Sequence, residues 1–498
     1  MKGVDLVAQS VLLGSVAFAL LVDAARTRNI ILGAALATVA TALATTAVTA
    51  SLLVTSLDLG VRDIASAGFI VAGATRALAA LVIAGIAWRS VPIERPRSAY
   101  VVPAVIILGA AVGDTHAVAR IGDVLPLAVA TVAHELGAAI WLGALPCFWR
   151  AMRQAGRERA QAIGRRFSIV AACGVALIVA GTAAFAVAYI GSVEGVYATA
   201  YGAMAATKGV LLALLLALGF ANFRVVNRAD GVGLARVVRF VEIEMAIGLA
   251  ALMAAASITS APPSVDDVAD RLTLSEVRAR VTPVAPRLAS PPHAMLGAAA
   301  APADIGARNA DDRAWSEYNH HWAGIGVLLI GVAGLAQRSA RARWARHWPL
   351  LFLLLAAFLL LRADPEIWPM GTVGPIESLR DPEVLQHRLF VVVIVAFALF
   401  EWRVRTGRIA SPALARVFPL VTAIGAMLLL LHSHAVVDAK EQVLIEYSHL
   451  PIAVLGVVAA SARWLEVMAP DDEGRVAGWV WPAAFVLVGL LLLNYREA

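Results

Sequence analysis

Eight of the ten histidines in the chain lie at or near the ends of long apolar segments. An ionisable side chain costs free energy inside a bilayer and is retained there mostly for a function. Imidazole nitrogens suit Cu, Zn, Fe or Ni, or an axial position on haem. A single histidine of this kind is more commonly an interfacial or capping group, but the set indicates a metal site. Its candidate ligands are His116, His134, His320, His321, His387, His432, His434 and His449.

Acidic and phenolic side chains accompany these histidines and are placed to orient ring nitrogens or to balance the charge of a metal. They are Asp114, Glu135, Asp438, Glu446 and Tyr447. Glu446 and His449 are three residues apart and therefore share one face of a helix. His432 and His434 are two apart and cannot share a face, so either the helix ends there or only one is a ligand. The adjacent pair at 320–321 poses the same alternative.

Two stretches of the chain carry a similar histidine pair. "GDTHAVAR" (113–120) and "LHSHAVVD" (431–438) share the letters HAV, so that His116 matches His434. His134 follows eighteen residues after the first histidine, and His449 follows fifteen residues after the second. Each pair places its later histidine two to three turns into the next helix. This pattern predicts a parallel internal repeat of six spans, with two extra spans closing the first part.

The apolar composition of the chain sets its fold class. The 498 residues are 60% hydrophobic and 15% charged, with a mean hydropathy of +0.79, which is far less charge than a soluble protein carries. Apolar runs recur throughout, and only helices satisfy the backbone in such spanning runs. We expect an all-α polytopic membrane bundle of about 14 transmembrane helices, since each run reaches the ~20 residues that a span needs. The lipid bilayer is therefore a partner.

Basic residues concentrate in alternate loops, including 150–166, 224–239 and 401–408. The positive-inside rule places these loops in the cytoplasm, so both termini and the histidine-bearing helix ends are expected in the periplasm of a bacterial inner membrane. A segment rich in Ala, Pro and Asp is typical of a periplasmic linker. We expect a first membrane domain over 1–261 with eight spans, this linker over 262–318, and a histidine-rich membrane domain over 319–498 with six spans.

Several function classes are disfavoured. The net charge of +6 comes from loop arginines and requires no nucleic acid. Cys147 and Cys173 lie in apolar runs without a CxxC motif, which argues against a disulfide framework or a thiolate metal site. No nucleotide-binding fingerprint is present, and the inside loops are too short for an ATP-driven pump. Lys208, about 10 Å inside a span, and Met204 one turn away are candidates for a pathway. Snorkelling explains Lys208 equally well, and packing explains Met204 better.

One part of the chain resembles a known family. "VAHELGAAIWLGALPCFWR" (132–150) is similar to the H-x-x-x-A-A-x-W-L-G segment of the copper resistance protein D family. The similarity continues through an R-F-S helix, a Y-G turn, a lysine-bearing helix and an "ALGxxN" end (165–228), and through a closing span (240–263). "THA" at 115–117 stands where the family has "GHA". The histidine-rich second part departs from the plain family pattern.

The resemblance implies a bacterial inner-membrane protein that moves copper, as Cu(I) or Cu(II), from the periplasm to the cytoplasm. His116, His134 and, less directly, Lys208 are the positions carried over, and a periplasmic copper carrier protein is the implied donor. Two other functions fit the histidines. One is a membrane redox protein with histidine-ligated haem b or copper, and the other is a copper sensor or chaperone-docking protein without transport. A transporter or metal-binding protein is favoured over an enzyme.

Overall fold

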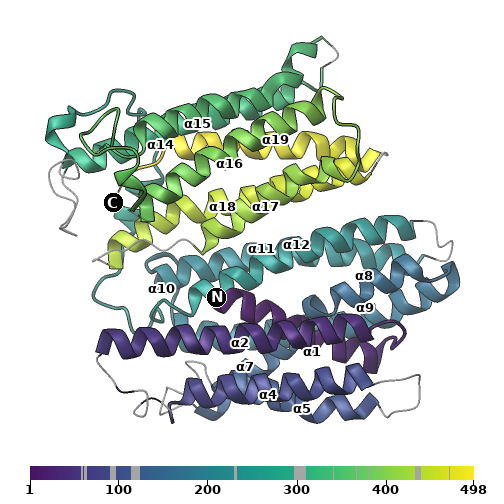
Figure 1. Ribbon diagram of the computed structural model, residues 1–498. Coiled ribbons are helices and arrows are strands. Elements are labelled where there is room, and N and C mark those ends of the chain that lie inside the picture. The colour runs from purple at the N-terminus through teal and green to yellow at the C-terminus, as the bar shows by residue number, and fades with distance from the viewer. Residues whose placement is uncertain are drawn as a thin grey trace. The chain divides into compact units, whose positions relative to one another are not determined.

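The computed structural model describes most of the chain (Figure 1). The described residues are 1–57, 60, 64, 66–89, 97–113, 124–228, 233–296, 310–339, 341–365, 367–380, 382–431, 439–469 and 472–497. They are almost entirely helical and contain no strand beyond an isolated bridge between Ile367 and Val373. This confirms the prediction of an all-α polytopic bundle. Five predicted site residues lie outside the described residues: Asp114, His116, His432, His434 and Asp438.

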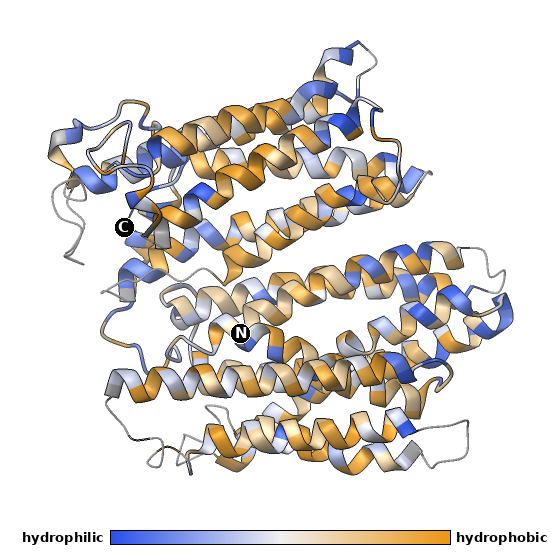
Figure 2. Cartoon of the chain, viewed as in Figure 1, coloured by the Kyte–Doolittle hydropathy of each residue, from blue (hydrophilic) through white to orange (hydrophobic). Residues whose placement is uncertain are grey.

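Within these ranges, eleven helices are long and apolar enough to cross a membrane. Three other helices occupy the remaining positions of the expected spans. They are the shorter apolar helices α5 (Val101–Gly113) and α17 (Val417–Leu430), and the 24-residue α16 (Pro382–Arg405). Figure 2 shows apolar residues along the lengths of the helices and hydrophilic residues mainly near their ends and in the loops. This distribution is the one that a bilayer requires of a helical bundle.

The chain forms two compact units. The first comprises Met1–Val196 and Lys208–Val268, and the second comprises Tyr197–Thr207 and Ala269–Ala498. Helices of the first unit are α1 (Lys2–Leu21), α2 (Arg28–Leu57), α4 (Gly68–Arg89), α5, α7 (Val124–Ala138), α8 (Leu145–Gln154), α9 (Arg157–Phe185), most of α11 (Ala200–Val226) and α12 (Leu234–Ile258). The short α10 (Val193–Tyr197) lies at the boundary.

Helix α1 lies at the centre of the first unit and packs against α2, α12 and the π-helical segment Ala139–Gly143 that follows α7. Two glycines permit this close approach. A Cβ at Gly14 would lie 2.2 Å from the carbonyl oxygen of Ala139, and one at Gly143 would lie 1.9 Å from that of Ser10. The two backbones are therefore in direct contact, and α1 is held against α7 near the predicted site residues of α7.

The second unit is built on long helices around an aromatic core. Its helices are α13 (Leu274–Val281), α14 (Ala310–Ala336), α15 (Leu351–Arg362), α16, α17, α18 (Ala439–Met468) and α19 (Asp472–Leu493). Helix α19 packs against both α14 and α18, and α17 packs against α18. Trp348, Phe418 and Trp481 are almost fully buried in its core. Large rings contribute much buried apolar area and stiffen this packing.

The described part of the segment expected as a linker is ordered against helix ends. Thr273 and Glu276 form a capping box at the start of α13. Beyond α13, the Val284 backbone N–H donates to Asn494 Oδ1 at 3.1 Å, and Arg280 donates to Ser448 Oγ at 3.3 Å. The segment therefore covers the start of α18 and the end of α19, which composition alone did not indicate.

Candidate functional site

Tyr495, just after the end of α19, brings two of the predicted histidines together. The His320 ring stacks on the Tyr495 ring with 3.8 Å between centroids, and the His449 ring meets it edge-on at 6.0 Å. Each imidazole Nδ1 lies near a carbonyl one turn earlier on its own helix, at 2.8 Å from Ser316 O and 2.9 Å from Ile445 O. A carbonyl only accepts, so Nδ1 carries the proton and Nε2 keeps its lone pair. This is how metal-ligating imidazoles are commonly oriented.

His321 is bound differently, because both of its ring nitrogens have hydrogen-bond partners. Its Nδ1 accepts a hydrogen bond from the Arg287 backbone N–H at 2.6 Å, with the Arg287 carbonyl farther away at 3.3 Å. Its Nε2 donates to the Tyr495 carbonyl at 2.8 Å. The side chain is buried, and both nitrogens are occupied. Of the adjacent pair, His320 is therefore the candidate ligand. His321 connects the backbone at Arg287 to the residues that follow α19.

Negative charge lies beside this histidine pair. Glu497 accepts hydrogen bonds from the Tyr495 hydroxyl, at 2.9 Å, and from the Ser316 hydroxyl. Burial raises the pKa of Tyr495, so its hydroxyl stays protonated near neutral pH and remains a donor. Glu446 is half-buried one turn before His449 on α18. These carboxyl groups favour a bound cation over a neutral ligand.

Two other predicted residues of the second unit have different partners. Tyr447 donates from its hydroxyl to the Tyr197 carbonyl at 2.7 Å, so it fastens α18 to the end of α10 instead of supporting a histidine. His387, at the start of α16, places Nδ1 2.6 Å from Asp364 Oδ1, and Arg388 faces the other oxygen of that carboxylate at 3.7 Å. A carboxylate at Nδ1 is a partner that commonly orients metal-ligating imidazoles.

The described residues contain no group of three or more His, Cys, Asp or Glu side chains that could hold a metal ion. Their contacts put His320 and His449 around Tyr495 and put His387 beside Asp364. A convergence of four outer imidazoles also involves His432 or His434, which lie outside the described residues. That convergence stays a prediction.

In the first unit, His134 lies on α7 against α9. Its Nδ1 is 3.4 Å from both the Ile178 carbonyl and the Thr182 hydroxyl, and its ring is tilted against Phe185 at 5.4 Å. Lys208 of α11 lies within electrostatic range of this imidazole. Met204, one turn earlier on α11, is 3% exposed and serves packing there. The two predicted pathway residues thus differ. Lys208 lies within electrostatic range of His134, whereas the Met204 side chain is buried by packing.

A buried ionic network adjoins His134 in sequence but was not predicted. Arg76 of α4 lies 2.7 Å from Asp5 Oδ2 and donates to Gln9 Oε1 at 3.3 Å. Gln9 in turn donates to Glu135 Oε2 at 3.4 Å. Glu135 therefore faces α1, while His134 faces α9, because consecutive residues of a helix point in different directions. The available signal was the lone arginine inside the apolar run Gly68–Arg89.

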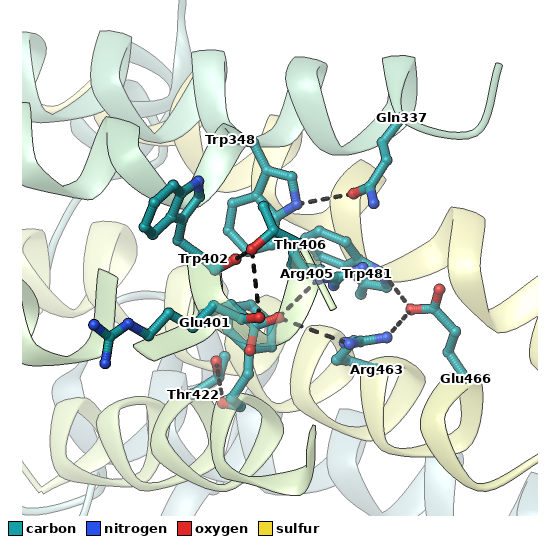
Figure 3. A network of polar contacts seen from close by, with 12 residues as sticks. Gln337, Trp348, Glu401, Trp402, Arg405, Thr406, Thr422, Arg463, Glu466 and Trp481 are labelled. Carbon is teal, nitrogen blue, oxygen red and sulfur yellow. Dashed lines mark hydrogen bonds and ion pairs between the residues drawn. The ribbon is translucent and has the colours of Figure 1, made fainter. Parts of the chain in front are cut away.

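A second unpredicted network lies at the opposite ends of the helices of the second unit. Figure 3 shows Glu401, Arg405, Arg463, Glu466 and Trp481 converging from α16, α18 and α19. Glu401 is fully buried and lies 2.7 Å from Arg405 Nε and 3.7 Å from Arg463 Nη2. Glu466 accepts from Arg463 at 2.7 Å and from the Trp481 indole at 2.8 Å. Paired in this way, the buried charges are compensated.

Aromatic rings complete this second network. The Arg405 guanidinium lies 5.3 Å from the ring centroids of both Trp348 and Trp481, and the Trp348 indole donates to Gln337 Oε1 at 3.0 Å (Figure 3). Cation–π contacts add to the ion pairs where water is excluded. In the sequence, the arginines at 401–408 indicated only that this loop faces the cytoplasm, and nothing indicated the network. The network is a clamp between helix ends, in which Glu401 pairs with Arg405 and Arg463, and Glu466 pairs with Arg463.

Comparison with known proteins finds one family that matches part of the chain. Residues 161–258 match the family model of copper resistance protein D. This match confirms the resemblance over α9, α11 and α12, about a fifth of the chain. The CopD-like segment contains Lys208, whereas His134 and the histidines of the second unit lie outside it. No curated protein matches the chain, and no solved structure does.

The CopD-like segment together with the apolar helices indicates a multi-pass membrane protein that handles copper. Imidazole nitrogens are ligands that copper accepts. His320 and His449 provide two such nitrogens on rings that both contact Tyr495, and His134 provides a third in the first unit. Copper binding at these imidazoles stays a prediction.

Proposed function

We propose that this protein carries copper from the periplasm to the cytoplasm across the bacterial inner membrane. The similarity of residues 161–258 to copper resistance protein D is the observation that carries the proposal. In this proposal, His320 and His449 capture the ion and His134 passes it on, with His116, His387, His432 and His434 as further ligands at the same side. Copper is the substrate, and a periplasmic copper carrier protein delivers it.

The charges of the two histidine regions support this division. A cation is favoured beside the Glu497 and Glu446 carboxyl groups and is opposed by the Lys208 ammonium near His134. Copper is therefore expected to stay longer near Tyr495 and to leave quickly from His134. A carrier needs both properties, because an ion that binds too tightly along the whole path is never released.

Copper flux into proteoliposomes containing the purified chain tests the proposal. The wild-type chain should accumulate copper above empty vesicles, and His134→Ala should reduce the initial rate about tenfold. His347→Ala is the matched control, because His347 accepts a hydrogen bond from the Trp402 indole at the other ends of the helices. Binding without flux in the wild-type chain would favour the sensor or chaperone-docking function, and a Soret band in the purified protein would favour the haem b redox protein.

Orientation is tested separately. Reporter fusions in the 150–166 and 401–408 loops should read as cytoplasmic, and fusions in the 262–317 segment should read as periplasmic. Reversed readings would place the Tyr495 region on the cytoplasmic side and would overturn uptake as the direction of transport.

A further inference from the structure

A basic surface lies on the second unit where α14 leads into α15 and where α16 ends. Residues 337–350 and 402–416 contain eight arginines and no Asp or Glu. The 3₁₀ helix η6 (Arg343–Leu350) packs against α16, which brings the two stretches together. Five of the arginines are exposed, namely Arg341, Arg343, Arg346, Arg403 and Arg408. None of these five pairs with a carboxylate among the residues that the structure describes.

Two hydrogen-bond donors face the imidazole of His347 within this surface. The Trp402 indole Nε1 lies 2.8 Å from His347 Nδ1, and Arg346 Nε lies 3.4 Å from His347 Nε2. A neutral imidazole has one lone pair, whereas indole and guanidinium N–H groups only donate. The shorter contact places the lone pair on Nδ1, so the N–H groups of His347 Nε2 and Arg346 Nε face each other. An anionic oxygen beside them would accept from both.

Arg408 adds a third donor group beside the same indole. Its guanidinium lies 4.5 Å from the Trp402 ring centroid, and the centroid of the His347 ring lies 6.3 Å from it. A guanidinium stacked on an aromatic ring keeps its planar fork of N–H groups available, and this fork matches phosphate oxygens. We call Arg346, His347, Trp402 and Arg408 the Trp402 cluster. Its side chains present donors to the surface and use their one lone pair internally.

Arginines near other helix ends already have acceptors within the chain. Arg159 lies 3.0 Å from Asp23 Oδ2. Arg28 donates to the backbone carbonyls of Ala87 and Trp88 at 2.8 and 2.9 Å. The positive-inside rule requires only that a loop carries basic residues, and these arginines meet it with their donors bonded. The converging donors of the Trp402 cluster are therefore not explained by topology.

The Trp402 cluster lies where a bilayer has its headgroups. A candidate span begins with η6, and α16 ends at Arg405, three residues before Arg408. Trp344 of η6 is 69% exposed, and an exposed indole at the end of a span is typical of the membrane interface. One turn into the span, Leu354 of α15 is 68% exposed. Acyl chains cover such apolar side chains, whereas a soluble anion does not.

We propose that the Trp402 cluster binds the phosphodiester of an anionic phospholipid. One phosphate oxygen accepts from Arg346 and His347, and another accepts from Arg408. A headgroup with an ammonium group would bring positive charge to a surface that has no carboxylate, so an anionic headgroup is preferred. The site lies at the opposite ends of the helices from the histidines proposed for copper, and copper flux does not require it.

Native mass spectrometry of the purified full chain in a neutral detergent tests this site. Dioleoyl phosphatidylglycerol should bind saturably and at least about tenfold more tightly than dioleoyl phosphatidylcholine, which has the same acyl chains and an added ammonium group. Inorganic phosphate in about tenfold molar excess should leave the lipid bound, because it lacks the chains. Equal binding of the two lipids, or displacement of the lipid by phosphate, would overturn the proposal.

Variants matched in charge locate the lipid, because a net charge of +6 attracts anionic lipid to other loops as well. Arg346→Gln and Arg408→Gln should each weaken phosphatidylglycerol binding about fivefold. Arg475→Gln is the matched control, since it removes the same charge from an exposed guanidinium that already pairs with Asp472. Equal weakening by all three changes would mean that the lipid responds to overall charge, and the assignment would be wrong.

Trp402→Phe separates the arrangement of donors from charge. It keeps every charge and a ring beside Arg408, but it removes the N–H that holds the His347 lone pair on Nδ1. His347 can then accept from Arg346, so phosphatidylglycerol binding should weaken about threefold. Unchanged binding in this variant would refute the arrangement of donors. The lipid comparison on the wild-type chain decides the matter if a variant fails to fold.

Discussion

His134 of the first unit and His449 of the second each lie ten residues after the first residue of their helix, α7 and α18. Their surroundings nevertheless differ. The His449 Nδ1 is held by its own helix at 2.9 Å, and its ring shares Tyr495 with His320. The His134 Nδ1 lies 3.4 Å from groups of a neighbouring helix and within range of a lysine. Although the two histidines lie at the same depth in their helices, we expect His449 to retain copper and His134 to bind it only transiently.

The two buried ionic networks differ in how close they lie to the histidine of their unit. In the first unit, Glu135 of the Arg76–Asp5–Gln9 network is the residue next to His134. In the second unit, Glu466 of the network in Figure 3 is seventeen residues after His449, or about 25 Å along α18. A buried ionic network therefore adjoins the histidine in sequence only in the first unit. The distant network of the second unit is better suited to holding helices than to moving ions.

The largest expected effect follows from this contrast. Glu401→Gln leaves Arg405 and Arg463 without their shared carboxylate and should lower the free energy of unfolding by about 3 kcal/mol, the usual cost of breaking a buried ion pair. Thermal or denaturant unfolding in detergent measures it. Asp472→Asn is the control, because the Asp472–Arg475 pair is highly exposed and contributes little. Equal effects would show that the buried network is no clamp. Copper bound per folded chain should stay unchanged.

Copper retention should show the next largest effect. His449→Ala and His320→Ala each remove one of the two imidazoles that contact Tyr495, and each should reduce the copper retained after purification about tenfold, since a proposed metal bond is lost. Metal analysis of the purified protein measures this. His321→Ala is the adjacent control and should destabilise the chain without releasing copper, because both of its ring nitrogens are already bonded. Copper loss in His321→Ala alone would reverse the assignment.

Hydropathy predicted the helical bundle, and the repeat predicted that two histidines lie at matching depth. What the sequence did not indicate depends on contacts between distant segments. The Tyr495 ring joins His320 and His449 only after α14, α18 and α19 have packed. The state of His321 depends on a backbone N–H from the segment expected to be a linker. Glu135 was expected beside His134, but helical geometry turns it toward Gln9.

In the first unit we expect a smaller effect, on the passage of copper and not on its retention. His134→Ala should mainly reduce copper accumulation in cells and leave most of the copper in purified protein. Lys208→Met removes a positive charge near His134 and should raise the copper retained severalfold while slowing its passage. Accumulation assays and metal analysis on the same variants separate the two effects. If His134→Ala removed all bound copper while His449→Ala left it unchanged, the roles of the two regions would be exchanged.

The smallest effect concerns the hydroxyl of Tyr495, the group that Phe185 beside His134 lacks. Tyr495→Phe keeps the ring against His320 and loses the hydroxyl contacts with Glu497 and Ser316, so retained copper should change by less than about twofold. Tyr495→Ala removes the ring as well and should lower it much further.

The pH dependence of the free energy of unfolding gives a second test of the Tyr495 hydroxyl. Burial raises the pKa of Tyr495, so the unfolded chain loses this proton first, as pH rises through its ordinary value of about 10. The contribution of the protonated hydroxyl is thus fully present below about pH 10, and wild-type stability falls above it, whereas Tyr495→Phe lacks this fall. Unfolding midpoints between pH 7 and 11 measure the difference. A gap between the two chains that already widens below pH 9 would mean that Tyr495 ionises in the folded protein, and the hydroxyl would then be part of the metal site.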